Sequence, residues 1–302
     1  MSSSSQDDEI SALEAPDPRL LMGSRDKSVL WYNPTFPVLT DVQKDLLENY
    51  SGLKPEVITS HVLSIASLLE LDWKPKLTFS PARQSLGRPS IALHHFSLSR
   101  STSYPRVLEL LKSGGKLLDL GCCFGQDLRK LVHDGAPASS LYGADLRSEF
   151  IDLGYDLFLD RDRIGVQFLT ADIFDPNSSL KQLDGQMSVV YIGLLLHLFD
   201  WEGQRKACER IVGFLKPEKG VLVLGQQVGC LVACDVMSGG ERKVTRHDLA
   251  SFEKLWKEVG ERTGSQWEVR ANLDEGLGVG DGTRAWDRHE TRRLVFEVER
   301  VL

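Results

Sequence analysis

The sequence predicts an α/β fold in which a mainly parallel sheet carries helices on both faces. Short apolar segments alternate with helical patterns after residue 116, and three of these segments carry an aspartate at or beside their carboxyl end. The segments span residues 117–120, 141–145, 166–172, 187–193 and 220–224, and two later ones span 267–269 and 294–298. Strands that alternate with helices are typical of a parallel sheet covered on both faces.

The 302 residues are expected to form three parts. Residues 1–27 are polar and are expected to be a disordered tail. Residues 28–113 carry helical patterns, one capped by Thr40 and Asp41 and a second opening at residues 54–56. We expect this region to be a helical lid that caps the substrate site. Residues 114–302 form the cofactor-binding domain.

Charge, cysteine content and hydrophobicity disfavour several classes of protein. The net charge is −7 and no basic block is present, which disfavours binding to nucleic acid. The five cysteines are odd in number and match no zinc-ligand spacing, so we expect neither a disulfide framework nor a metal site. No signal peptide and no apolar run of ~18 residues are visible, so we expect a cytoplasmic protein without a membrane span.

Residues 116–127 read K-L-L-D-L-G-C-C-F-G-Q-D, a pattern typical of a strand, a glycine turn and a helix. Gly121 and Gly125 permit a tight turn close to a ligand, and the helix N-terminus behind the turn favours an anionic group. Asp119 precedes the turn, and Cys123 stands where a dinucleotide fingerprint has glycine. Cys123 is expected to act as a small turn residue rather than as a nucleophile.

The strand ends predict an adenosyl cofactor. Asp145 follows Gly121 at nearly the ~20-residue offset of a ribose-binding acid. Asp172 is placed to accept the adenine amine, with Ile173 covering the ring. Each acid alone would equally serve as a helix N-cap. Because all three lie at the ligand-binding edge of a parallel sheet, together they favour cofactor binding.

His197 follows the fourth strand and is the candidate general base. The alternative is that it caps the next helix or packs in the loop. Gln226 and Gln227 follow the fifth strand, and they would either position a polar substrate group or satisfy backbone groups.

Several stretches together resemble fungal class I methyltransferases of meroterpenoid and polyketide pathways. They are residues 32–34 (Y-N-P), 52–62, 117–137, 141–146 (L-Y-G-A-D-L), 150–161, 171–176 (A-D-I-F-D-P) and 197–201 (H-L-F-D-W). The resemblance implies a Rossmann-like, seven-stranded sheet with one antiparallel strand at its edge. It also implies S-adenosylmethionine (SAM) as methyl donor and a small hydrophobic natural-product acceptor. The best-known members resemble enzymes that esterify a carboxyl group on a farnesylated aromatic polyketide, and a phenol is the next acceptor to consider.

The expected cofactor contacts are Tyr32, Asp119, Gly121, Gly125, Asp145, Leu146, Asp172, Ile173 and Tyr191. Two stretches depart from the family pattern. Gln226 and Gln227 follow Gly225 where the family often reads G-R-Q-V-G, and residues 79–96 also differ. Two other classes stay open at this stage: an NAD-dependent oxidoreductase on a related fold and a non-catalytic interaction subunit. A homodimer formed through the N-terminal helices is also open.

Overall fold

The computed structural model describes residues 39–71, 96–238, 242–275 and 290–302. Tyr32, the expected tail at 1–27 and most of the segment 79–96 lie outside these residues. The division into tail, lid and cofactor domain therefore stays a prediction.

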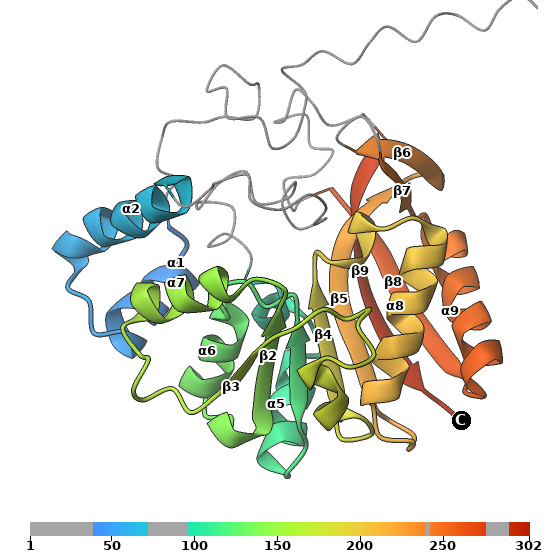
Figure 1. Ribbon diagram of the computed structural model, residues 1–302, viewed down its shortest axis with the longest axis horizontal. Helices are drawn as coiled ribbons and strands as arrows, with labels where there is room; N and C mark the ends of the chain where they lie inside the picture. Colours follow the sequence, from blue (N-terminus) through green and yellow to red (C-terminus); the bar gives the residue numbers. More distant parts are fainter. Residues whose placement is uncertain (1–38, 72–95, 239–241, 276–289) are drawn as a thin grey trace, which may run out of the picture.

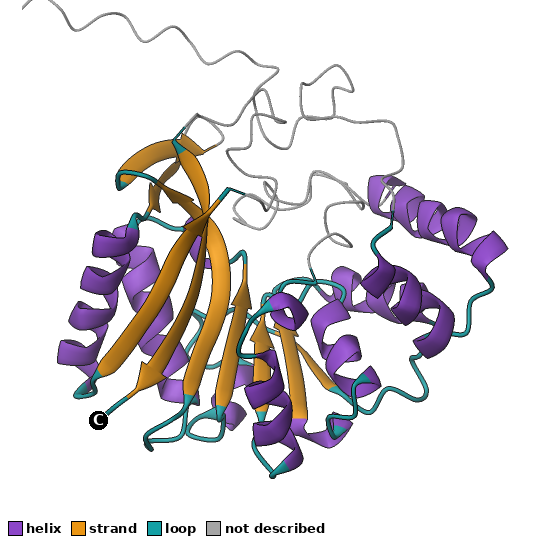
Figure 2. Ribbon diagram, turned by 180° about the vertical axis from the view of Figure 1, so that it is seen from behind, coloured by secondary structure: helices purple, strands orange, loops and turns teal. Residues whose placement is uncertain are grey.

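Seven strands form one sheet in the order β3-β2-β1-β4-β5-β9-β8. The strands are β1 (Leu117–Leu120), β2 (Leu141–Asp145), β3 (Gln167–Thr170), β4 (Val189–Gly193), β5 (Leu222–Cys230), β8 (Trp267–Asp274) and β9 (Thr291–Arg300). Strands β1 to β5 pair in parallel, so their carboxyl ends meet at one edge. Helices cover both faces of the sheet (Figures 1 and 2), which confirms the predicted fold class.

The antiparallel strand lies one position inside the edge, not at the edge as expected. Strand β9 runs antiparallel to β5 on one side and to β8 on the other, and β8 forms the edge. The long pairing explains the order, because β9 matches β5 from Leu222↔Glu299 to Cys230↔Thr291. A nine-residue β5 and a ten-residue β9 satisfy more backbone groups together than either would at an open edge.

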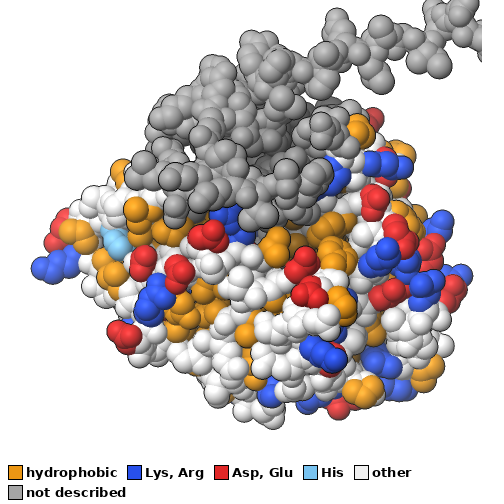
Figure 3. All heavy atoms as spheres, in the orientation of Figure 1, with side chains coloured by type: hydrophobic (Ala, Val, Ile, Leu, Met, Phe, Trp, Pro, Cys, Tyr) orange, Lys and Arg blue, Asp and Glu red, His pale blue; other side chains and the backbone are white. Residues whose placement is uncertain are grey.

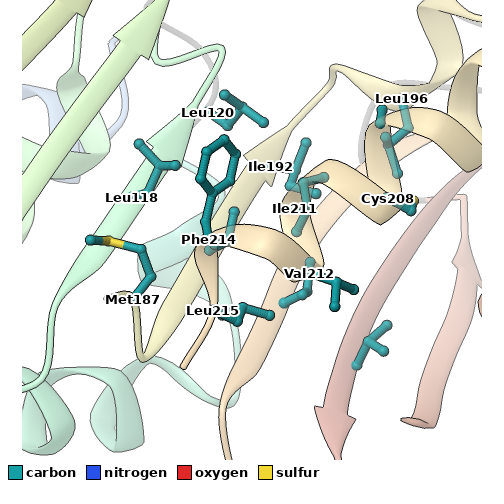
Figure 4. Close-up of a cluster of buried hydrophobic side chains, with 14 of the residues drawn as sticks. Leu118, Leu120, Met187, Ile192, Leu196, Cys208, Ile211, Val212, Phe214 and Leu215 are labelled. Atoms are coloured by element: carbon teal, nitrogen blue, oxygen red, sulfur yellow. The ribbon is translucent and has the colours of Figure 1, made fainter. Parts of the chain in front are cut away.

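One face of the sheet packs against α8 (Trp201–Phe214) and α9 (Leu249–Thr263). Figure 4 shows Ile211 and Phe214 of α8 against Leu118 of β1 and Ile192 of β4. Both helices begin with an aspartate N-cap: Asp200 accepts from the Gly203 N–H, and Asp248 accepts from the Ser251 N–H. Such caps satisfy otherwise unpaired N–H groups at the helix start.

The opposite face carries α5 (Tyr104–Lys112), α6 (Gln126–His133) and α7 (Ser148–Phe158). Val107 and Leu111 of α5 pack with Leu117 and Leu222 of the sheet. Helix α5, which lies within the region 28–113, therefore contributes to the core of the sheet. Three short 3₁₀ helices lie in the connections of the main sheet: η4 (Ala138–Ser140), η5 (Ser179–Leu183) and η6 (Leu196–Leu198).

The described N-terminal elements pack on α6 and α7. They are α1 (Asp41–Asp45), the π-helix η2 (Leu46–Tyr50), α2 (Pro55–Leu71) and the 3₁₀ helix η3 (Leu98–Arg100). Helix α2 packs against α7, and both η2 and η3 pack against α6. Leu46, Ile58 and Val62 form a buried cluster with Phe124 and Phe158. Thr40 caps α1 through a capping box, as the sequence predicted.

A separate hairpin, β6 (Cys234–Ser238) with β7 (Arg242–Arg246), stands beyond the end of β5 (Figure 1). Acidic and basic side chains are interspersed over the described part of the face in Figure 3. Among the described residues, no helix is long and apolar enough to cross a membrane, and no group of residues could hold a metal ion.

Candidate active site

The glycine turn after β1 has the geometry that the sequence predicted. Gly121 and Gly125 have φ of 79° and 62°, and Cys123 between them has φ of 51°. Positive φ is easy for glycine and strained for cysteine. A Cβ on Gly125 would also lie 2.7 Å from Phe168, so this position excludes a side chain. The N–H groups of Gly121 and Cys122 donate to the Ala144 carbonyl at 2.8 and 3.0 Å, which fixes the turn against β2.

A buried ion pair fixes the second half of this turn, at Phe124 and Gly125. Arg129 of α6 contacts Asp160 with Nε–Oδ2 at 2.7 Å and Nη2–Oδ1 at 2.8 Å. Its Nη1 donates to the Phe124 carbonyl at 2.5 Å and to the Gly125 carbonyl at 3.3 Å. The Tyr50 hydroxyl donates to Asp160 at 2.7 Å, and both charged side chains are at most 1% exposed. The turn is therefore rigidly positioned from α6, from the loop after α7 and from η2.

Asp145 bonds the middle of the turn, at Cys123. Its Oδ2 accepts from the Cys123 N–H at 3.0 Å, and its Oδ1 accepts from the Arg147 N–H at 3.0 Å. Burial raises the pKa of Asp145, and these two hydrogen bonds oppose that rise. A second acid, Asp119, is 3% exposed. Burial, followed by the charges of Asp127 and Asp145, raises the pKa of Asp119 well above its usual value.

A third acid, Asp127, was missed in the sequence. It lies in the first turn of α6, where an acid is ordinary for a helix N-terminus. Its Oδ1 accepts from the Leu98 N–H at 3.1 Å, and burial raises its pKa to about 7. None of Asp119, Asp127 and Asp145 forms an ion pair within the described part of the chain. Clustered buried carboxylates of this kind suit a cationic ligand, and SAM carries a sulfonium and an ammonium group.

Asp172 and its neighbours lie at the same edge of the sheet, where the parallel strands end. The Ala171 N–H donates to the Asp145 carbonyl at 2.9 Å, which sets Asp172 beside the end of β2. Asp172 Oδ1 accepts from the Phe174 N–H at 2.8 Å. Ile173 is buried, whereas Leu146 is 42% exposed. The expected acids of the first three strands are thus adjacent in the fold.

Tyr191 of β4 is buried on the same edge, and its hydroxyl hydrogen-bonds to the Ser97 hydroxyl. With the contact from Leu98 to Asp127, this bond brings residues 97–98 against the glycine turn. Tyr32, the remaining expected contact, lies outside the described residues.

His197 lies in η6, next to the turn. Gly121 and Leu195 are close: a Cβ added to Gly121 would lie 3.6 Å from Leu195 Cδ1. The glycine turn and the loop after β4 are therefore in contact. His197 does not cap α8, because Asp200 has that role. Its Nδ1 is buried and has no hydrogen-bond partner among the described residues. Burial, followed by the charges of Arg293, Arg246 and Arg242, lowers the pKa of His197 to about 3.

Gln226 and Gln227 lie near the end of β5. Both are buried, and no hydrogen bond within the described residues involves Nε2 of Gln226 or either polar side-chain atom of Gln227. They are therefore not satisfying backbone groups there. A buried amide without partners is costly unless a ligand pairs with it, so this pair is available to a polar substrate group.

The seven-stranded sheet, the glycine turn and the strand-end acids define a class I methyltransferase architecture. The family described as "Methyltransferase domain" matches residues 117–218. The chain is 42% identical over 284 residues to O-methyltransferase atr3 of Stereocaulon alpinum, covering 91% of this chain and 77% of that protein. It is 38% identical over 240 residues to methyltransferase adrK of Penicillium roqueforti, covering 79% and 83%. Among solved structures, phosphoethanolamine methyltransferase 2 of Haemonchus contortus matches 65% of this chain and 52% of that chain, with 14% identity and a TM-score of 0.45.

The chain belongs to the fungal class I methyltransferases of meroterpenoid and polyketide biosynthesis. It is a SAM-dependent methyltransferase of natural-product biosynthesis. The oxidoreductase and the non-catalytic scaffold, which the sequence left open, are thereby set aside.

Proposed function

We propose that the enzyme methylates a carboxylate oxygen of a small hydrophobic natural-product intermediate and forms a methyl ester. The observation that carries this proposal is the environment of His197. Burial, followed by the charges of three arginines, lowers the pKa of this side chain to about 3, which keeps it neutral near neutral pH.

A phenol acceptor needs a base that removes its proton. Phenols have a pKa near ~10, so an imidazole whose pKa is lowered to about 3 is a poor acceptor for the phenolic proton. A carboxylic acid with a pKa near ~4 is already ionised and needs no base. The arginine charges that depress the pKa of His197 also attract an anion. Both effects favour a carboxylate over a phenol.

The residues of the site then have separate tasks. When bound, SAM would supply a methyl group on a positively charged sulfur, and the neutral thioether would leave as the acceptor oxygen takes the methyl group. In this proposal Asp145 accepts hydrogen bonds from the ribose hydroxyls, and Asp172 with Ile173 holds adenine. Asp119 and Asp127 supply negative charge for the cationic groups of the cofactor. Leu195 presents an apolar side chain beside the glycine turn, which excludes water from the reacting groups.

The test compares kcat/KM for pairs of aromatic acids and phenols that share one carbon skeleton. We expect the acid of each pair to be preferred, and the preference to persist in His197→Gln because no base is required. Preference for the phenol, lost in His197→Gln, would assign the base role to His197 and refute the carboxylate proposal.

A further inference from the structure

The β6–β7 hairpin has two different faces. Val236 lies opposite Val244 in the hairpin, and both are buried, so the face that they share is the packed one. Arg242 and Arg246 are two residues before and after Val244, and side chains alternate along a strand. Both arginines therefore lie on the packed face. Lys243 lies on the other face, where it is exposed and pairs with Asp235 at 2.6 Å.

Hydrogen bonds anchor this hairpin beside the loop that carries His197. The Thr245 N–H donates to the Phe199 carbonyl at 3.0 Å. Gln204 Nε2 donates to the Phe199 carbonyl at 3.1 Å and to the Thr245 carbonyl at 2.8 Å, so α8 joins the two segments. Arg246 Nη1 donates to Thr291 Oγ1 at 3.0 Å and ties the hairpin to β9. The packed face of β7 is thus fixed relative to η6.

The two arginines of this face differ in their partners. Arg246 donates a hydrogen bond to Thr291. In contrast, Nε and Nη2 of Arg242 are buried and have no hydrogen-bond partner among the described residues. Arg242 also forms no ion pair with a described carboxylate, and burial alone lowers its pKa. Arg242 is only partly buried, but its Nε and Nη2 are shielded from water without a partner, which is unfavourable, and binding an anion there removes that cost. Arg242 lies on the same strand as Thr245, whose N–H bonds the Phe199 carbonyl, so it stands beside the loop that carries His197, on the proposed acceptor side of the site.

We propose that the Arg242 guanidinium binds the carboxylate of the acceptor and sets the specificity of the enzyme for acids. This assignment rests on the proposed function. A guanidinium fork matches a carboxylate in a planar, two-bond geometry, and a neutral phenol offers no such partner. Arg246 and Arg293 add positive charge around the same place without being the anchor, because Arg246 is already bonded and Arg293 lies on β9.

The experiment uses the full-length enzyme and three variants: Arg242→Gln, Arg242→Lys and, as a matched control, Lys243→Gln. Lys243 is the next residue of the same strand, and its variant removes one positive charge from the opposite face. Steady-state KM and kcat are measured with an aromatic carboxylic acid, and the Kd for SAM is measured by calorimetry. Hydrogen bonds to charged groups contribute about 1.5–3 kcal/mol, so Arg242→Gln should raise KM for the acid by roughly 10- to 150-fold. Its kcat and its Kd for SAM should stay close to wild type.

Arg242→Lys keeps the charge and loses the fork, so its KM should be intermediate, and Lys243→Gln should match wild type. An unchanged KM in Arg242→Gln, in an enzyme that forms methyl esters, overturns the assignment of Arg242 alone. A wild-type enzyme that forms only phenyl ethers overturns the proposed function instead. A KM rise matched by a weaker SAM Kd would show that Arg242 acts through the cofactor, and it also overturns the assignment. If Arg242→Gln does not fold, the KM of Arg242→Lys for the acid tests the proposal instead. A KM equal to that of the wild type in Arg242→Lys would then overturn it.

Discussion

The Arg129–Asp160 pair offers a quantitative test of how the cofactor turn is held. Asp160→Asn keeps the shape of the side chain and removes its charge, so the guanidinium of Arg129 stays buried without a counterion. Removing one partner of a buried ion pair typically costs about 3–5 kcal/mol. The upper half of this range is expected, because Asp160 accepts two bonds from Arg129 and one from Tyr50. Urea unfolding followed by tryptophan fluorescence measures the free energy of unfolding.

Two further variants separate charge from packing. Tyr50→Phe removes a single hydrogen bond to a charged group and should cost about 1.5–3 kcal/mol. The double variant Arg129→Met with Asp160→Leu removes both charges, and it should be more stable than Asp160→Asn because no unpaired charge stays buried. Because Arg129 also bonds the Phe124 and Gly125 carbonyls, the double variant should nevertheless bind SAM more weakly. A cost below ~1 kcal/mol for Asp160→Asn, or a double variant less stable than it, would refute this reasoning.

Three other predictions concern the titrating and cofactor-binding residues. The folded-state pKa of His197 is about 3, below its unfolded value of ~6.5, so the unfolded chain binds the proton first and stability falls as pH drops from ~6.5 to ~3. Thermal unfolding across this range should show a shallower slope in His197→Gln, and an unchanged slope would count against a buried neutral imidazole. The pKa of Asp127 is raised to about 7, and a cation prefers the ionised carboxylate, so SAM should bind more tightly as pH rises through ~7. Calorimetry should show this trend in wild type and a flat profile in Asp127→Asn; an identical trend in both would remove Asp127 from the cofactor site. Asp145→Ala should raise the Kd for SAM, and an unchanged Kd would contradict the ribose assignment.

Much of the cofactor side was predictable because it depends on local sequence. The turn at Gly121 and Gly125 follows from a strand, a pair of glycines and a helical pattern within a dozen residues. Asp145 and Asp172 were found because parallel strands bring their carboxyl ends together, so position along the chain translates directly into position in space. These are rules of connectivity, and they need no knowledge of side-chain packing.

The acceptor side could not be read in the same way. Arg242 stands in a short, mostly polar hairpin with little hydrophobic alternation, so the local sequence predicts no strand there. Its relation to His197 arises from hydrogen bonds between β7, α8 and the loop after β4, over separations of about 40 residues. Likewise, Asp160 follows α7 with nothing in the local pattern to pair it with Arg129. The order of β9 and β8 also depends on long-range pairing rather than on local patterns.

The most direct test of the central claim uses one acceptor that carries both a carboxyl and a phenolic hydroxyl group on the same aromatic skeleton. The enzyme is incubated with this acceptor and SAM bearing an isotopically labelled methyl group. Mass spectrometry before and after mild alkaline hydrolysis then locates the label. A labelled methyl ester that hydrolysis removes is the predicted product. A label that survives hydrolysis as a phenyl ether would contradict the account.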